Sequence, residues 1–192
     1  HKGLDVRRYS MLVVNPAVPK TAPLVQQARS AGVYCTSEMN LFLARCKGKI
    51  VGITGSNGKT TTTALTAHLL QGSDRRVWLG GNIGVSLLDR VHEIDERDAV
   101  VLELSSFQLL LNITPNHLDR HGSMDAYAEA KSAIFRYQKP RDITILNYDD
   151  ARASALQGLV PSRLALVSTK KKIQPGAYIE RGLFTVHLGK QA

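Results

Sequence analysis

The chain has 192 residues, of which 43% are hydrophobic and 21% are charged. This composition indicates a soluble globular protein with a sizeable core, and no apolar run approaches the roughly 20 residues that span a bilayer. The formal net charge of +9 indicates a polyanionic partner. Since the basic residues are dispersed and not interleaved with aromatic ones, phosphorylated small molecules fit this charge as well as nucleic acid does.

Apolar segments that predict strands alternate with segments that predict helices. The predicted strands are residues 10–16, 32–35, 49–54, 75–80, 98–104, 142–147 and 163–168. The predicted helices are residues 22–32, 59–71, 84–91, 123–137 and 149–159, and residues 177–189 predict a hairpin that turns at Arg181-Gly182. Continuous apolar strands that alternate with helices indicate an α/β fold with a mostly parallel sheet covered on both faces.

Two further signals in the sequence mark the end of a helix and a boundary between domains. Gly32 is expected at the position that follows the end of the first helix, where glycine is common. A polar stretch that ends near Lys47 precedes a fresh strand, and we expect a domain boundary there.

One connection does not fit this scheme. The strand at 98–104 is followed by another apolar segment from Leu109, and parallel neighbours in one sheet need a crossover of a dozen or more residues. The intervening residues are too few for that. Either the geometry is unusual or residues are absent from the sequence near positions 110–111, and we favour the second explanation.

The stretch "TGSNGKT" lies between a predicted strand and a predicted helix, which is the layout of a phosphate-binding loop. Glycines let successive backbone N–H groups turn toward one anion, the helix N-terminus adds its positive end, and Lys59 supplies a mobile charge. The strict pattern requires glycine at position 53, which is isoleucine here. We therefore predict a variant loop in which Gly55, Gly58, Lys59 and Thr60 bind the phosphates and Mg²⁺. The alternative is a glycine-rich turn without a ligand.

Glu103 ends the strand at 98–104. Taken alone, an acidic residue at a strand end is usually a solvated rim residue. The carboxyl ends of parallel strands meet at one edge of a sheet, so Glu103 is expected near the loop, where it could bind the metal directly or through water.

The two cysteines, Cys35 and Cys46, do not form a C-x-x-C pair. Free thiols in a reducing cytoplasm are the simplest interpretation.

Four segments carry a family resemblance. "GITGSNGKTT", "GGNIGVSLLD", "VLELSSFQL" and "NITPNHLDRHGSMDAYAEAKSAIF" occur in this order and resemble the Mur ligases of peptidoglycan synthesis. The loop is shared with the wider superfamily, which includes folylpolyglutamate synthase. The other segments are more specific and are most similar to the members that add D-glutamate.

The resemblance implies an organisation in domains. Residues 1–47 would be the C-terminal part of a Rossmann-like N-terminal domain that binds the UDP-substrate. Residues 48–192 would be an incomplete central ATPase domain of the P-loop type. The family's C-terminal domain has no counterpart in this sequence, so we expect a longer ligase of which these residues alone are inactive.

The resemblance also implies a reaction. An ATP-dependent acid–amino-acid ligase would phosphorylate the carboxylate of UDP-N-acetylmuramoyl-L-alanine, and the amine of D-glutamate would attack the acyl phosphate. The cofactors would be ATP and Mg²⁺ at two sites. The enzyme would be a cytoplasmic monomer, without nucleic-acid or membrane partners, that serves cell wall biogenesis, cell shape and cell division.

The family's site residues transfer to matching positions of this sequence. The nucleotide-binding set is Gly55, Ser56, Asn57, Gly58, Lys59, Thr60 and Thr61. Thr60 and Glu103 match ligands of the first Mg²⁺, His117 matches a ligand of the second, and Lys131 matches a carbamylated lysine that supplies an anionic oxygen ligand. Lys59, His117 and Lys131 form the catalytic set. The substrate-binding set is Asn15, Asn82, Ser105 and Gln108.

Two points qualify the resemblance. The family commonly has Ser-Pro-Gly in a loop that approaches the UDP, whereas this sequence has Asn15, Pro16 and Ala17. An alternative function is a nucleotide-binding regulatory or scaffold module that lacks ligase activity. The alternative is disfavoured because a scaffold does not need ligands for a second metal, whereas this sequence carries the complete set of Lys59, Thr60, Glu103, His117 and Lys131.

Overall fold

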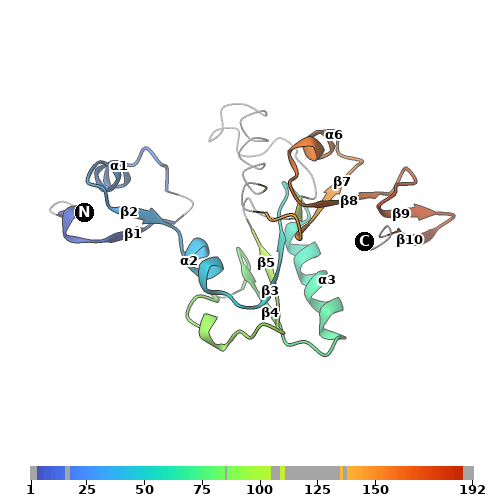
Figure 1. The fold of residues 1–192 in the computed structure, drawn as a ribbon, viewed down its shortest axis with the longest axis horizontal. Coiled ribbons are helices and arrows are strands. Elements are labelled where there is room, and N and C mark those ends of the chain that lie inside the picture. The colour runs from blue at the N-terminus through green and yellow to red at the C-terminus, as the bar shows by residue number, and fades with distance from the viewer. Residues whose placement is uncertain are drawn as a thin grey trace. The chain divides into compact units, whose positions relative to one another are not determined.

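The computed structural model describes residues 4–15, 18–84, 86–104, 109–110, 135 and 138–187. The chain forms two compact units (Figure 1). The first unit is His1–Gly48 with Ser86–Glu96, and the second is Lys49–Val85 with Arg97–Ala192. The domain ranges 1–47 and 48–192 stay a prediction, since the segment 86–96 groups with the first unit.

The first unit is built around a small parallel sheet. Its strands are β1 (Met11–Val13) and β2 (Tyr34–Thr36), and its helices are α1 (Pro23–Ser30), α2 (Glu38–Arg45) and the short 3-10 helices η1 (Val6–Arg8) and η2 (Val91–Glu93). A core of Val6, Ala28 and Val33 holds α1 against the sheet. The end of α1 confirms the position predicted for Gly32: the N–H of Gly32 donates to Arg29 O at 3.1 Å, and that of Val33 to Ala28 O at 2.9 Å.

The helix predicted at residues 84–91 is wrong. Of that segment, the described residues form bends and turns, and only η2 begins at its end. The Ser86 hydroxyl accepts from Leu88 N at 3.2 Å and donates to the Glu38 carboxylate. Local side-chain bonds of this kind offer the backbone an alternative to a helix, and burial of Leu87 and Ile94 fixes the segment in the first unit.

The second unit contains a three-stranded parallel sheet in the order β3-β5-β4. Its strands are β3 (Lys49–Ile53), β4 (Val77–Gly81) and β5 (Ala99–Glu103). Every residue of the central strand β5 is buried, as a continuous apolar strand predicts. Helix α3 (Lys59–Gln71) runs along this sheet (Figure 1) and packs Ala67 on Ile53 and Val101. The predicted bounds of this helix are confirmed.

A second sheet of the same unit has the order β10-β9-β8-β7-β6. Its strands are β6 (Leu109–Leu110), β7 (Ile143–Asn147), β8 (Arg163–Ser168), β9 (Gly176–Glu180) and β10 (Leu183–His187). The pairs from β6 to β9 are parallel, which confirms a mostly parallel α/β fold. Helix α6 (Ala151–Ala155) continues into the 3-10 helix η4 (Leu156–Leu159), and their residues Ala153 and Leu156 pack on Leu146 and Phe135.

Strands β5 and β6 belong to different sheets. We expected absent residues near positions 110–111 because parallel neighbours in one sheet need a long crossover. The structure does not pair β5 with β6, so this reason does not apply to them. Apart from Phe135, the helix predicted at 123–137 lies outside the described residues. Among the helices that the structure does describe, none combines the length and apolar character needed to cross a bilayer.

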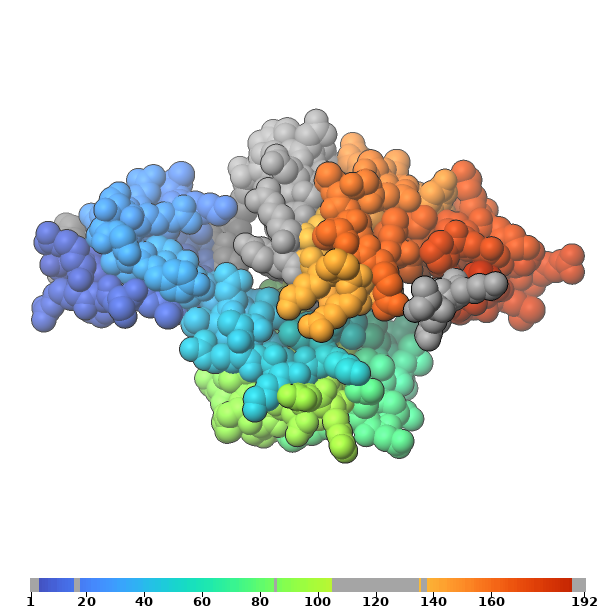
Figure 2. Space-filling model, in the orientation of Figure 1, coloured from blue at the N-terminus to red at the C-terminus, as the bar shows by residue number. Residues whose placement is uncertain are grey.

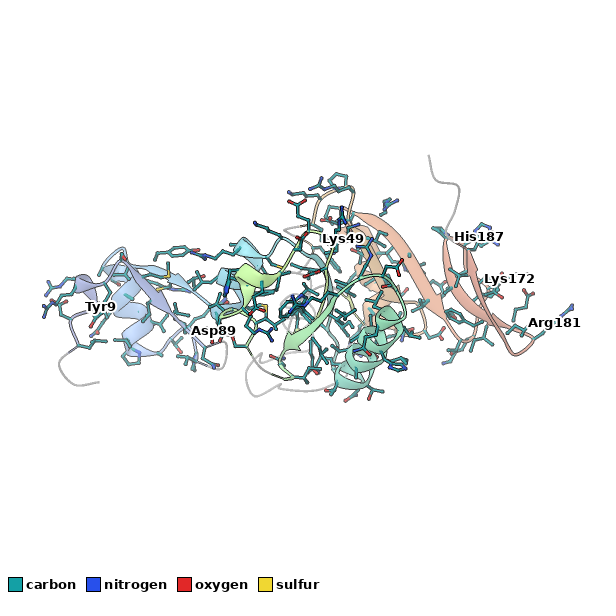
Figure 3. The ribbon with its side chains drawn as sticks, turned by 90° about the horizontal axis from the view of Figure 1, so that it is seen from below. Tyr9, Lys49, Asp89, Lys172, Arg181 and His187 are labelled. Carbon is teal, nitrogen blue, oxygen red and sulfur yellow. The ribbon has the colours of Figure 1, made fainter. Side chains whose placement is uncertain are left out.

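The hairpin of β9 and β10 turns where the sequence predicts it. Glu180 pairs with Leu183, and the two residues between them have positive φ, 51° at Arg181 and 78° at Gly182. Two successive positive φ values match the twist of an antiparallel hairpin. Arg181 lies at the tip of the hairpin (Figure 3), whose residues are red in Figure 2. Leu183 and Phe184 of this hairpin are exposed.

Candidate functional site

The connection between β3 and α3 forms the predicted loop. Ile53 and Thr54 are fully buried, Ser56 is buried, and the chain then emerges at Asn57. Gly58 is the N-cap of α3 with φ 76°, a left-handed conformation that glycine adopts without strain, and its carbonyl accepts the bond from Thr62 N at 3.0 Å. A buried strand thus delivers a glycine-containing turn to a helix N-terminus, which is an anion-binding arrangement.

The Lys59 side chain folds back across this loop. Its Nζ donates to the carbonyls of Gly55 at 2.8 Å and Ser56 at 3.0 Å. The half-buried ammonium is therefore held over the turn by backbone oxygens at the start of the helix. A cation held there can meet the terminal phosphates of a nucleotide that binds the loop.

The four threonines that follow Lys59 have different environments. Thr60 and Thr61 are both exposed, but Thr60 Oγ1 donates to Glu103 Oε2 at 2.8 Å. Thr63 is fully buried, and its hydroxyl donates to Lys59 O at 2.8 Å. The first threonine thus contacts the site and the fourth supports the first turn of the helix, although β-branched residues are poor helix formers.

Glu103 is the buried partner of the loop. It is the last residue of β5, it pairs with Ile53 on one side and Gly81 on the other, and it is 5% exposed. A buried carboxylate is costly unless it is paired and hydrogen-bonded. Thr60 supplies one hydrogen bond, and a divalent cation would supply the opposite charge.

The residues present fit Mg²⁺ bound together with a nucleotide. Mg²⁺ prefers oxygen ligands and is commonly held by one or two protein groups plus phosphates and water. The hydroxyl of Thr60 and the carboxylate of Glu103 are such groups. Within the described residues, no cluster of three or more His, Cys, Asp or Glu side chains could hold a metal. These residues would therefore supply only a few of the ligands of Mg²⁺, and phosphates and water the others.

The two asparagines predicted to bind substrate lie in different units. Asn82 follows β4, is exposed, and donates its backbone N–H to Glu103 O at 2.8 Å, which ties it to the end of β5. Asn15 belongs to the first unit and follows β1, and its carbonyl accepts from Val18 N at 2.9 Å. The structure therefore ties the backbone of Asn82 to Glu103 at the end of β5, and describes Asn15 only within its own unit.

Four predicted site residues lie outside the described residues: Ser105, Gln108, His117 and Lys131. Their roles as substrate contacts, metal ligand and carbamylated lysine stay predictions.

A carboxylate that the sequence analysis did not single out organises the ends of β7 and β8. Asp149 accepts from the Ser168 hydroxyl, from Thr169 N at 2.7 Å and from Thr169 Oγ1 at 2.9 Å. Burial raises the pKa of the Asp149 carboxyl, but these hydrogen bonds and the nearby charge of Lys170 together bring the pKa below its ordinary value. The available signal was an aspartate two residues after the predicted strand at 142–147.

Comparisons with known proteins agree with this geometry. A model of the Mur ligase middle domain matches residues 53–184. A UDP-N-acetylmuramoylalanine--D-glutamate ligase of Clostridium novyi (strain NT) is 43% identical over 99% of this chain and 43% of its own length. A protein of the same name from Clostridium perfringens (strain 13 / Type A) is 38% identical over 95% of this chain and 42% of its own. The chain spans less than half the length of these curated relatives.

Solved structures share the fold at lower identity. The MurF ligase of Thermotoga maritima in complex with ADP has a TM-score of 0.54 at 19% identity, over 94% of this chain and 56% of its own. The UDP-N-acetylmuramate:L-alanyl-gamma-D-glutamyl-meso-diaminopimelate ligase from Neisseria meningitides has a TM-score of 0.59 at 13% identity, over 88% of this chain and 64% of its own. These likenesses support the architecture alone.

Proposed function

Because the chain belongs to the Mur ligase family, we propose that it is the nucleotide-binding part of a longer ligase that joins D-glutamate to UDP-N-acetylmuramoyl-L-alanine. The curated relatives carry the name of that reaction. One observation in the structure carries the proposal furthest: the bond between Thr60 Oγ1 and Glu103 Oε2 lies beside a loop that Lys59 spans.

The proposed reaction asks the protein for charge neutralisation rather than covalent chemistry. Transfer of the γ-phosphoryl group of ATP to the substrate carboxylate gives an acyl phosphate and ADP, and the D-glutamate amine then displaces phosphate. Fixed donors around the moving group lower the barrier without reorganising. The loop amides and Lys59 would hold the β- and γ-phosphates in this step. Bound Mg²⁺ would supply further positive charge at the phosphates, held by Thr60 and Glu103.

The remaining site residues belong to the same proposal. Asn82 stands at the end of β4 beside Glu103, the proposed metal ligand, which suits a contact to the UDP-sugar substrate near the reacting carboxylate. Ser105, Gln108 and Asn15 would also be contacts to that substrate. His117 would bind a second Mg²⁺, with a carbamate on Lys131 as its neighbour. We also propose that the enzyme is a monomer and that it acts in the cytoplasm.

A coupled assay of ADP release on the full-length protein tests the reaction. We expect turnover that requires both UDP-N-acetylmuramoyl-L-alanine and D-glutamate. ATP hydrolysis that is independent of either substrate would point instead to a nucleotide-binding module without ligase activity. D-alanine and L-glutamate in place of D-glutamate serve as matched controls, since they test the side chain and the configuration of the amino acid separately.

A further inference from the structure

At the end of β4, Gly81 faces the backbone of Glu103 with a close approach that leaves no room for a Cβ. This glycine pairs with Glu103 and has φ 98°. A Cβ built on Gly81 would lie 2.1 Å from Glu103 O, 2.8 Å from Glu103 N and 2.9 Å from Glu103 C. No side chain fits at this position without moving the backbone of Glu103.

The close approach has a direct consequence for Glu103. It lets the next residue, Asn82, donate its N–H to Glu103 O at 2.8 Å, while Leu104 N donates to Ile53 O at 2.8 Å on the other flank. The backbone around Glu103 is thus held from both neighbouring strands. Its carboxylate is buried and accepts from the Thr60 hydroxyl.

We infer that Gly81 is a positioning residue for the metal-binding carboxylate of Glu103, acting through the backbone of Asn82. Residues that orient a metal ligand are typically worth about 10–100-fold in metal affinity. Asn82 then has two separable roles: its N–H fixes Glu103, and its side chain is available to the substrate. The inference rests on the proposed nucleotide and Mg²⁺ site.

The chain contains a matched control for the steric part of this inference. Gly176 has φ 155°, and a Cβ on it would lie 2.0 Å from Leu166 O, 2.9 Å from Leu166 C and 3.0 Å from Leu166 N. It therefore makes the same kind of interstrand approach, between β9 and β8 of the other sheet. Gly176→Ala therefore introduces a comparable clash between a Cβ and the facing strand, in the other sheet.

The experiment measures the dissociation constant of a fluorescent ATP analogue for the full-length protein, once with Mg²⁺ and once with EDTA. For wild type we expect Mg²⁺ to tighten binding. Gly81→Ala should reduce this Mg²⁺-dependent gain at least tenfold and leave the affinity in EDTA within about twofold. Gly176→Ala should retain the full gain. Equal losses in both variants, or an undiminished gain in Gly81→Ala, would overturn the inference.

A second pair of variants decides the question if Gly81→Ala does not fold. Asn82→Pro removes the N–H donor to Glu103, whereas Asn82→Ala keeps it and removes only the side chain. We expect the Mg²⁺-dependent gain to fall in the proline variant and to persist in the alanine variant. The inference is wrong if the two variants lose the gain to the same extent. If wild type does not bind the nucleotide at all, it is the proposed function that fails.

Discussion

Thr60 and Glu103 lie 43 residues apart in the sequence, and the hydroxyl of one donates to the carboxylate of the other at 2.8 Å. The bond joins the first turn of α3 to the end of β5. It couples the proposed phosphate-binding loop to the one buried carboxylate that the described residues place beside that loop. Changes at either residue should therefore affect metal-dependent binding before they affect the fold.

Thr60→Val should weaken Mg²⁺-dependent nucleotide binding by about 10–100-fold. The substitution keeps the shape of the side chain but removes the proposed metal ligand and the donor to Glu103. Titration of a fluorescent ATP analogue with and without Mg²⁺ measures the effect. Thr62→Val is the control, because Thr62 lies two residues further along α3, on a different face of the helix, and is not part of the proposed site. A Mg²⁺ dependence equal to that of wild type would remove Thr60 from the metal site.

Lys59→Ala should abolish measurable nucleotide binding at micromolar protein concentrations. The variant loses the cation that spans the loop and the bonds to the Gly55 and Ser56 carbonyls. Because Lys59 is only half-buried, the free energy of unfolding should fall by no more than about 1.5 kcal/mol. Isothermal titration calorimetry and urea denaturation check the two parts. Retained affinity would contradict the role of the loop.

Trp78→Phe should destabilise the protein without affecting nucleotide binding. Trp78 Nε1 donates to Asp98 Oδ2 at 2.8 Å, and the Arg76 guanidinium lies 4.1 Å from the centre of the indole ring. Removing the donor from a buried carboxylate costs about 1–3 kcal/mol. Urea denaturation measures the loss. A folded variant with impaired nucleotide affinity would show that this end of the sheet also serves the site.

Asp149→Asn should reduce stability in a pH-dependent manner. The folded-state pKa of Asp149 lies below its ordinary value of 3.8, so its contribution is present above the unfolded-state pKa and is lost as pH falls through the folded-state pKa. At neutral pH we expect a loss of about 1–2 kcal/mol, which shrinks below about pH 4. Urea denaturation across this range checks the sign, with the exposed Asp74→Asn as control. A difference that grows toward low pH would contradict it.

Lys131→Ala should abolish ligase activity, and added short-chain carboxylic acids should partly restore it. This follows from the proposed carbamate, since a small carboxylate can occupy the place of its anionic oxygen atoms. The rate of ADP release against acetate concentration measures the rescue. Full activity of Lys131→Arg would exclude the carbamate, because arginine does not form one under these conditions.

The sequence predicts the part of the site that depends on local chain order. The bounds of α3 follow from the order of strand, glycine-rich turn and helix, and the turn at Arg181-Gly182 follows from turn chemistry. The proximity of Thr60 and Glu103 follows from the rule that the carboxyl ends of parallel strands share one edge. These features need only short segments and the choice of a parallel sheet.

The features that the sequence does not predict depend on contacts between distant segments. The helix expected at 84–91 has the right composition, but the bonds of Ser86 to Glu38 and Leu88 override it. The sequence "GGNIG" signals only a turn. The closeness of Gly81 to Glu103 arises only when β4 and β5 pair. Segregation of β5 and β6 into different sheets is likewise a property of the assembled chain.

The segment 86–96 lies between two strands of the second unit but groups with the first. The polypeptide therefore passes between the units at three points, and no single cut separates them. A chimera that exchanged only residues 1–48 with a homologue would part Glu38 from Ser86 and leave Leu87 and Ile94 against foreign side chains. Recombination among such proteins, natural or engineered, should succeed only when both pieces are transferred together.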